Sequence, residues 1–284
     1  MKKIPLGQHT EYPQTYSPGI LFPVPRADAR RASGIIDQDA AGLPFRGTDF
    51  WRGYELSWLD GSGKPQVSIA EFEMSAESPN LIESKSFKLY LNSLNMTRFN
   101  TREDLMSTLE QDLSAVAGMP VSARLVSDAP LHDGGVTGAD KVDCILLDEL
   151  AAGFDGFEHD ASLLKCGSGI SGSRQETLVS HLFRSLCPVT AQPDWGSVFI
   201  RYAGVAMDHE SVLRYLLAYR QHQGFHEDCV ERIFCDLQRQ CQPEWLVVGI
   251  QFLRRGGLEI NPWRWSESAP VSAGEHAGLR TARQ

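Results

Sequence analysis

The segment WLDGSGKPQVSIAEFEM, residues 58–74, decides the fold class. Its second part, QVSIAEFEM (66–74), alternates apolar and polar residues with the period of two that is typical of a strand with one buried face. Gly61-Ser62-Gly63 precedes this strand, and glycines permit the backbone angles of a tight turn. The segment therefore predicts a hairpin and, with it, antiparallel sheet.

Further along the first half, the pattern changes to that of a helix. Thr101 is a natural N-cap for TREDLMSTLEQDLSAVAG, acidic residues follow in the first turn, and Gly118 is a stop signal. One apolar stripe runs along this helix at Leu105, Leu109, Leu113 and Val116. VSARLVSDA (121–129) is predicted to be the next strand.

The second half repeats this alternation of elements. RQETLVSHLFRSL (174–186) is predicted to be a helix, because Leu178, Leu182 and Leu186 are spaced at i, i+4 and i+8. The remaining elements are a strand SVFIRYAG (197–204), helices HESVLRYLLAYRQH (209–222) and HEDCVERIFCDLQRQC (226–241), and a strand WLVVGIQFLRRGG (245–257).

Strands, helix and strand thus recur in a similar order in both halves. This arrangement favours an α+β fold with antiparallel sheet over alternating βαβ units. We expect an irregular N-terminal arm at 1–45, a first half at 46–130, a connection at 131–170 around the apolar run CILLDEL, and a second half at 171–284.

Composition narrows the function classes. The chain has 284 residues, and its 42% hydrophobic and 22% charged residues are ordinary for a globular protein. A net charge of −9 argues against direct nucleic-acid binding, which needs clustered Lys and Arg. No segment approaches the roughly 18 apolar residues of a membrane-spanning helix, and the N-terminus lacks the apolar core of a secretory signal. Six cysteines without a CxxC pair favour reduced thiols in the cytoplasm.

Cys187 is the first candidate for chemistry. It lies in LCPVTAQPDWGS (186–197), where the predicted helix meets Pro188 and the backbone must turn. Seven residues later comes Asp194, beside an aromatic residue that could raise the pKa of its carboxyl by desolvation. A thiol and a protonated carboxylic acid suit the addition of sulfur to a polar multiple bond. The alternative is a buried structural cysteine near a turn aspartate.

GFHEDCVERI (224–233) places His226 and Glu227 at a helix start. Glu227 could accept two hydrogen bonds from the amidine-like edge of a purine, and His226 could orient the ligand or transfer protons. The alternative is a helix N-terminus at which the dipole favours acidic residues. His222 and His226, at i and i+4, also allow a metal site, but no third ligand is evident, and we predict none.

Two further segments carry charge. In NLIESKSFKLYLNS (80–93), Lys85 and Lys88 could contact phosphates and Glu83 could bind a heterocycle, with a solvated strand or turn as the alternative. RRGGLEINP (254–262) offers the arginines and glycines that a pyrophosphate or 2′-phosphate would need. GxGxxG after a strand, GxxxxGK[ST] and GxSxG are all absent, so Rossmann, P-loop and serine-hydrolase sites have no support.

Together these segments resemble the long form of 7-cyano-7-deazaguanine reductase, the nitrile reductase of queuosine biosynthesis, a tRNA modification. The matching strings occur in the same order: NLIESKSFKLYLNS, ETLVSHLFRSLCPVTAQPDWGS, FHEDCVERIF and RRGGLEINPWR. PFRGTDFWRGYELSWLDGSGKPQV extends the likeness over most of residues 44–264. The resemblance implies two tandem tunnelling (T-) folds, each with antiparallel sheet and helices packed on one face, and a homodimer.

The family's chemistry gives each matching residue an expected role. The resemblance implies that Cys187 adds to the nitrile carbon to form a thioimide, and that Asp194 donates a proton. Hydrides from two NADPH molecules then give the primary amine, 7-aminomethyl-7-deazaguanine. Substrate-binding positions are matched by Ile82, Glu83, Ser84, His226 and Glu227. Cofactor-binding positions are matched by Ser84, Lys85, Arg255 and Gly256.

Two other functions stay open at this point. One is a zinc-dependent pterin- or GTP-processing hydrolase, because tunnelling-fold enzymes share a purine-anchoring glutamate. The other is a non-enzymatic purine-binding module in which Cys187 is merely buried. NADPH-dependent turnover and a covalent adduct on Cys187 distinguish the reductase from both.

Overall fold

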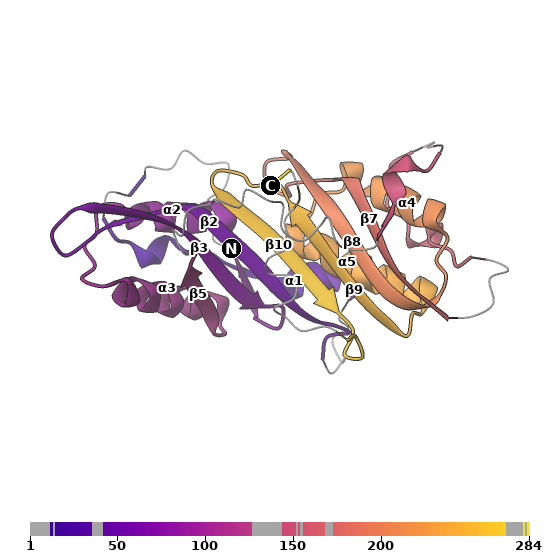
Figure 1. Cartoon of the computed structure of the whole chain (residues 1–284), viewed down its shortest axis with the longest axis horizontal. Coiled ribbons are helices and arrows are strands. Elements are labelled where there is room, and N and C mark those ends of the chain that lie inside the picture. The colour runs from indigo at the N-terminus through magenta and orange to yellow at the C-terminus, as the bar shows by residue number, and fades with distance from the viewer. Residues whose placement is uncertain are drawn as a thin grey trace. The chain divides into compact units, whose positions relative to one another are not determined.

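The computed structural model describes residues 12–13, 15–35, 42–126, 144–151, 153, 156–167, 173–270, 281 and 283–284 (Figure 1). The chain forms two compact units, each built from separate stretches of sequence. Unit 1 comprises Met1–Ala29, Asp49–Gly134 and Arg254–Ile260, and unit 2 comprises Arg30–Thr48, Gly135–Leu253 and Asn261–Gln284. Much of the expected connection at 131–170, including residues 131–143, lies outside the described residues.

Unit 1 contains the predicted hairpin. Strands β2 (Arg46–Leu59) and β3 (Pro65–Ser75) flank a turn in which the Asp60 N–H donates to the carbonyl of Lys64 at 3.0 Å. The Asp60 carboxylate accepts from the backbone N–H groups of Ser62 and Lys64, which closes the turn as short polar side chains commonly do. The strand order in unit 1 is β5 (Val121–Leu125), β3, β2, and then residues 258–260 of β10 (Leu258–Trp265).

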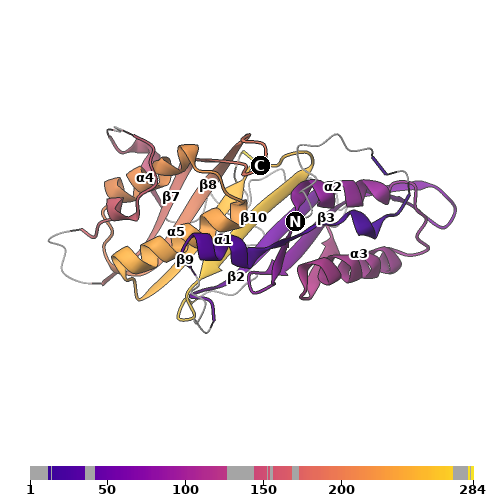
Figure 2. The same cartoon turned by 180° about the vertical axis from the view of Figure 1, so that it is seen from behind.

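Two helices, α2 (Ser84–Ser93) and α3 (Arg102–Ala117), lie on one face of the unit 1 strands (Figure 2). The predicted caps of α3 are confirmed. The Thr101 hydroxyl accepts from the N–H of Asp104, the Asp104 carboxylate accepts from the N–H of Thr101, and Gly118 has a left-handed φ of 76°. Short polar residues and one glycine therefore set both ends of this helix.

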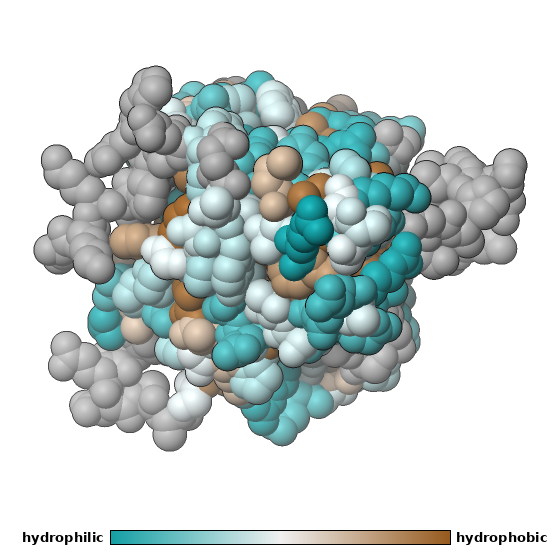
Figure 3. All heavy atoms as spheres, turned by 90° about the vertical axis from the view of Figure 1, so that its left-hand side faces the viewer, coloured by the Kyte–Doolittle hydropathy of each residue, from teal (hydrophilic) through white to brown (hydrophobic). Residues whose placement is uncertain are grey.

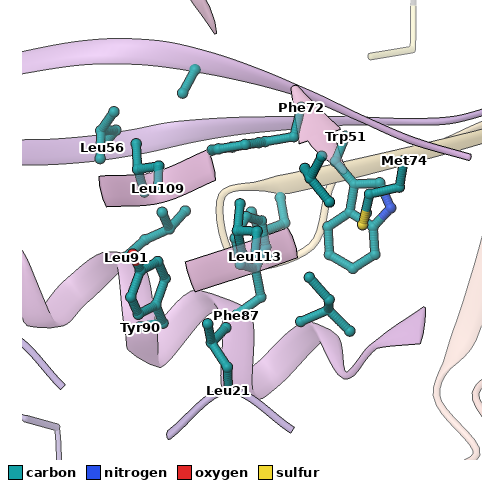
Figure 4. Packing of buried hydrophobic residues seen from close by; sticks show 14 of the residues in the cluster. Leu21, Trp51, Leu56, Phe72, Met74, Phe87, Tyr90, Leu91, Leu109 and Leu113 are labelled. Atoms are coloured by element: carbon teal, nitrogen blue, oxygen red, sulfur yellow. The ribbon is translucent and has the colours of Figure 1, made fainter. Parts of the chain in front are cut away.

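The core of unit 1 lies between these helices and strands. Figure 4 shows Phe72 and Met74 of β3 packed with Phe87 of α2 and with Leu109 and Leu113 of α3. Phe87 meets Phe72 edge-to-face at 5.1 Å between ring centroids, a favourable aromatic geometry. Seen from the side in Figure 3, mostly hydrophilic residues cover the surface, and apolar ones form small separate areas.

The N-terminal arm contains regular structure, where we expected none. Strand β1 (Pro23–Pro25) pairs antiparallel with β4 (Asn80–Ile82), and helix α1 (Arg26–Ala32) follows directly. In unit 2, Arg30 of α1 donates two hydrogen bonds to the buried carboxylate of Glu231, at 2.8 and 2.7 Å. A buried charge pair of this kind needs fixed geometry, so it holds this part of helix α1 in a defined position within unit 2.

In unit 2 the strand order is β10, β9 (Trp245–Phe252), β8 (Pro193–Val205), β7 (Ser173–Leu186) and β6 (Ile145–Leu146). All neighbours pair antiparallel except β6 and β7, which are parallel. Helices α4 (His209–Leu217) and α5 (His226–Cys241) cover one face (Figure 2). The predicted α+β class, with antiparallel sheet and helices on one face, is confirmed.

The predicted helix at 174–186 is wrong, because these residues form strand β7. Leu178 is buried, but Leu182, four residues on, is 40% exposed, so the leucine spacing does not mark one helix face. β7 instead pairs with β8 from Ser173 to Leu186, with a register shift between Ser180 and Phe183. That irregularity breaks the simple alternation that would have indicated a strand.

The sequence did not predict the regular structure of two other regions. Strand β10 was not expected, since RRGGLEINP was treated as the end of a strand and not as a turn into another. Residues 80–93, considered as a solvated strand or turn, form β4 and helix α2. Among the described residues, no helix is long and apolar enough to span a membrane.

We predict that Gly249→Ala destabilises unit 2. Gly249 of β9 lies opposite Trp263 of β10, and a Cβ atom there would overlap the buried indole ring. Overpacking of this kind costs about 1–3 kcal/mol or more. Chemical denaturation should show a lower midpoint than for the wild type. Gly19→Ala, where a Cβ would meet no atom within 4 Å, is the control, and equal midpoints for both variants would contradict the prediction.

Candidate active site

Cys187 follows strand β7 directly, at the start of a tight turn into β8. The turn is closed by two backbone hydrogen bonds: Cys187 N–H to the Gln192 carbonyl at 2.9 Å, and Ala191 N–H to the Cys187 carbonyl at 3.0 Å. Ala191 adopts a positive φ of 54°, which is uncommon for a residue with a side chain. The thiol is free and only 6% exposed. The expected helix junction is thus a strand end, but the expected change of direction at Pro188 is present.

A second contact ties this strand end to the start of helix α5. Leu186 donates its N–H to the carbonyl of His222 at 2.8 Å, and Gly224 donates to the carbonyl of Leu186 at 3.1 Å. Gly224 has little room for a side chain, since a Cβ would lie 3.0 Å from the His222 ring. Cys187 and the first turn of α5 are therefore held near one another by the backbone.

Asp194 lies on β8 directly opposite Ser185 of β7. Its carboxyl is 4% exposed, and its Oδ1 lies 3.6 Å from Nε2 of His226. Because Ser185 and Cys187 are two residues apart at the end of an extended strand, they lie on the same face. The acid, the imidazole and the thiol thus belong to one end of unit 2.

Phe252 holds the His226 ring. The two rings stack with centroids 3.7 Å apart and an interplanar angle of 8°. Nδ1 of His226 is buried and has no hydrogen-bond partner among the described residues, so its Nε2, on the Asp194 side, is the nitrogen with a polar neighbour. This packing leaves the imidazole one well-defined orientation.

Glu227 is the second residue of α5 and is 3% exposed. A carboxylate at this position is favoured by the helix dipole and needs polar partners when it is buried. Cys229, two residues further along α5, is fully buried, and burial raises the pKa of its thiol well above the ordinary value. Cys229 is therefore a neutral, unreactive thiol beside the candidate site. Across the described residues, no three His, Cys, Asp or Glu side chains converge as a metal site requires.

The remaining expected site residues lie in unit 1. Ile82 ends β4 and packs into the core, and Glu83 is the N-cap of α2. The two carboxylate oxygens of Glu83 accept from the N–H groups of Lys85 at 3.0 Å and Ser86 at 2.8 Å. Burial raises the pKa of Glu83, and the two backbone hydrogen bonds oppose the rise. Ser84 and Lys85 are half-buried in the first turn of the same helix.

Arg255 and Gly256 form the turn between β9 and β10. Arg255 and Leu258 exchange backbone hydrogen bonds at 2.9 and 3.2 Å, and Gly256 and Gly257 both have positive φ, 58° and 77°. A Cβ on Gly256 would lie 2.6 Å from Nζ of Lys88. The turn and α2 together border a pocket of about 210 Å³ lined by Tyr12, Glu55, Lys88, Leu91, Asn92, Asn95, Gly256, Gly257 and Leu258.

Two family models match the chain. Residues 12–125 match the N-terminal model of the nitrile reductase 7-cyano-7-deazaguanine reductase, and residues 193–270 match the QueF-like protein model. A Bordetella pertussis protein named NADPH-dependent 7-cyano-7-deazaguanine reductase is 49% identical over 285 residues, covering 100% of this chain and 99% of the relative. The chain belongs to the 7-cyano-7-deazaguanine reductase family.

A second relative agrees with this assignment. A protein of the same name from Burkholderia vietnamiensis is 49% identical over 282 residues, which cover 99% of this chain and 98% of that protein. Among solved structures, an apo archaeosine synthase QueF-Like matches 36% of this chain and 99% of its own, with 17% identity and a TM-score of 0.31.

Sequence reasoning missed two residues of the site. Phe252 lies in a strand that was predicted correctly, but its stacking on His226 involves residues 26 positions apart. Ser185 lies in the segment predicted to be helical, so its pairing with Asp194 could not be expected. Because 174–186 was predicted to be a helix, the pairing of β7 with β8 could not be predicted. This pairing places Cys187 and Asp194 at the same end of the two strands.

We predict that His222 makes folding stability depend on pH. Burial lowers the pKa of His222 to about 4, with smaller contributions from Arg232 and His159. In the unfolded chain this imidazole takes up a proton near pH 6.5, so the folded state loses stability as the pH falls from about 6.5 to about 4. His222→Gln should reduce that loss by about 1–2 kcal/mol, after allowance for partial exposure.

Denaturation midpoints at pH 7 and pH 4.5 measure this loss. His209→Gln is the control, because His209 is half-buried at the start of α4 and pairs with Glu176, so its removal is not expected to reduce the loss. A pH dependence in His222→Gln equal to that of the wild type would show that His222 titrates normally in the folded protein.

Proposed function

We propose that this protein reduces the nitrile of 7-cyano-7-deazaguanine to the primary amine 7-aminomethyl-7-deazaguanine with NADPH, a step of tRNA queuosine biosynthesis. The observation that carries the proposal is that Cys187, Asp194 and His226 lie at one end of unit 2, in one hairpin turn and at the start of one helix. Family membership supports the reaction class. The residue roles below are part of the proposal.

Cys187 is the nucleophile. Its sulfur bonds to the nitrile carbon while one of the three carbon–nitrogen bonds breaks, and the nitrogen takes a proton from Asp194. The product is a thioimide on the enzyme, and no oxidation or reduction occurs in this addition. The thiol proton replaces the one that Asp194 gives up, with His226, 3.6 Å away, able to relay it.

The surroundings of Asp194 suit this role. A proton donor to a nitrile must stay protonated near neutral pH, and the carboxyl of Asp194 is 4% exposed. Burial by itself favours the neutral form of a carboxylic acid.

Glu227 and His226 bind the substrate's purine-like edge, and Ile82, Glu83 and Ser84 provide further contacts. Each carboxylate oxygen of Glu83 already accepts one backbone N–H, but a carboxylate has about four lone-pair sites. Glu83 therefore keeps acceptor capacity for a ligand N–H while its own helix fixes its orientation.

NADPH supplies the two hydrides when it is bound, one from each of two molecules. The residues at the expected cofactor positions fit a phosphorylated ligand. The Gly256–Gly257 turn is a cradle that a side chain would fill, and Lys88 lies against it at the border of a pocket of about 210 Å³. Ser84 and Lys85 at the N-terminus of α2, together with Arg255 and Gly256, would hold the cofactor there.

The wider arrangement completes the proposal. The two units are two tandem tunnelling folds: the expected first half, 46–130, supplies most of unit 1, and the expected second half, 171–284, supplies most of unit 2 and the nucleophile. The protein works in the cytoplasm as a homodimer and acts on a small molecule. The free cysteines of the described residues, six in all, suit a reducing compartment.

We predict that Cys187→Ala loses both turnover and the adduct. Intact-protein mass spectrometry after mixing with 7-cyano-7-deazaguanine, without NADPH, should show one added substrate in the wild type and none in the variant. Cys235→Ala is the matched control, because Cys235 is a buried thiol whose pKa is raised by burial to about 12. Retained NADPH oxidation in Cys187→Ala would overturn the assignment of the nucleophile.

Asp194→Asn should slow adduct formation while the protein still binds substrate. The amide keeps the shape of the side chain but has no acidic proton, and general acid catalysis contributes about 10²–10⁴-fold to a rate. Stopped-flow measurement of adduct formation from pH 6 to pH 8 tests this expectation. An unchanged rate across that range would remove Asp194 from the proton-donor role.

A further inference from the structure

A group of arginine and aromatic side chains lies beside the candidate active site in unit 2. We name it the Trp195 cluster and define it as Arg184, Trp195, Arg220 and Phe157. The guanidinium carbons of Arg184 and Arg220 lie 5.6 and 5.4 Å from the Trp195 ring centroid, and Arg220 also lies 6.0 Å from that of Phe157. Cation–π contacts of this kind orient a guanidinium without neutralising it.

The two arginines carry uncompensated charge. Nη1 of Arg184 donates to the backbone carbonyl of Arg220 at 2.9 Å, and within the described part of the chain neither guanidinium has an ion pair with a carboxylate. This is unusual in a chain with 36 acidic and 27 basic residues. Both side chains are half-buried, so their charge is poorly screened by water. The cluster thus presents two fixed positive groups to an anion.

The strand residues of the Trp195 cluster lie at the same two strand ends as Cys187 and Asp194. Arg184 pairs with Trp195 across β7 and β8, and the next pair toward the strand ends is Ser185 with Asp194. Cys187 lies three residues beyond Arg184. Side chains alternate along a strand, so Arg184 and Trp195 point away from the Asp194 face while staying within one residue of it.

We propose that the Trp195 cluster binds a phosphate group of NADPH. This inference rests on the proposed function and names Arg184 and Arg220 as the residues that contact the phosphate. A planar guanidinium donates two parallel hydrogen bonds to a phosphate, and Arg suits this role better than Lys for that reason. NADPH carries a pyrophosphate and a 2′-phosphate, and either group suits a pair of guanidinium groups.

The nature of the ligand follows from the charges. The nitrile substrate is a nucleobase without a phosphate, and it gains nothing from two unpaired guanidinium groups. A phosphorylated cofactor can bind these guanidinium groups through its phosphates. It must also approach the carbon bound to Cys187, because that carbon receives the hydride. The indole of Trp195 fixes both arginines before the ligand arrives, which lowers the entropy cost of binding.

Isothermal titration calorimetry with NADP⁺ tests the proposal without turnover. We expect Arg184→Ala and Arg220→Ala each to weaken binding about tenfold or more, because a hydrogen bond to a charged group contributes about 1.5–3 kcal/mol. Arg184→Lys and Arg220→Lys keep the charge but lose the fork, and they should show intermediate affinity. The matched control is Arg214→Ala, since Arg214 on α4 already pairs with Glu210 at 2.6 Å.

Parallel titrations with NAD⁺ identify the phosphate involved. A loss for NADP⁺ alone assigns the 2′-phosphate, and equal losses for both cofactors assign the pyrophosphate. NADP⁺ affinity within twofold of the wild type in both alanine variants overturns the proposal, as does a loss that is matched in Arg214→Ala.

Adduct formation with 7-cyano-7-deazaguanine in the absence of NADPH separates this inference from the proposed function. Normal adduct formation in Arg184→Ala and Arg220→Ala, together with weaker NADP⁺ binding, supports a cofactor role. Slower adduct formation in these variants would instead show that the cluster acts through the Cys187 site and would overturn the phosphate assignment. A wild-type protein that forms no adduct contradicts the proposed function itself, whatever the arginine variants bind.

Discussion

Two backbone hydrogen bonds at Leu186 determine the geometry of the catalytic end of unit 2. They join the end of β7 to the His222–Gly224 segment, from which α5 begins two residues later. Without them, the turn that carries Cys187 and the helix start that carries His226 and Glu227 would have no fixed relation. Backbone hydrogen bonds of this kind fix two segments because the N–H and C=O groups on both sides need partners. The arrangement of the candidate side chains therefore depends on this backbone pairing at Leu186, which no sequence motif predicts.

Around this constraint, the site combines polar groups with tight packing. His226 is oriented by Phe252, Asp194 is buried opposite Ser185, and Cys229 nearby stays a neutral thiol. Burial raises the pKa of the Cys229 thiol and so keeps it protonated, and the proposed mechanism uses the buried carboxyl of Asp194 as the proton donor. The proposed nucleophile Cys187 lies in a turn at a strand end, whereas Cys229 lies on helix α5 in the core, and such surroundings decide which thiols of a chain can react.

Local signals predicted those elements whose ends and faces are encoded nearby. Helix α3 was predicted from Thr101 and Gly118, and the β2–β3 hairpin from its glycine turn, and both are confirmed. The segment 174–186 failed because a strand with an irregular register can place leucines four residues apart by chance. Pairing with β8, a contact between residues up to 32 positions apart, overrode the apparent helical period.

By itself, the sequence determined the α+β class, the family, and the residue types at the candidate site, since composition, turn residues and four ordered motifs are local properties of the chain. Only the tertiary structure decided that Cys187 ends a strand, that Asp194 lies opposite Ser185, and that Phe252 stacks on His226. The same holds for the two arginines on Trp195. These relations arise from strand register and packing between distant residues, which depend on the whole fold and leave no signal in a short stretch of sequence.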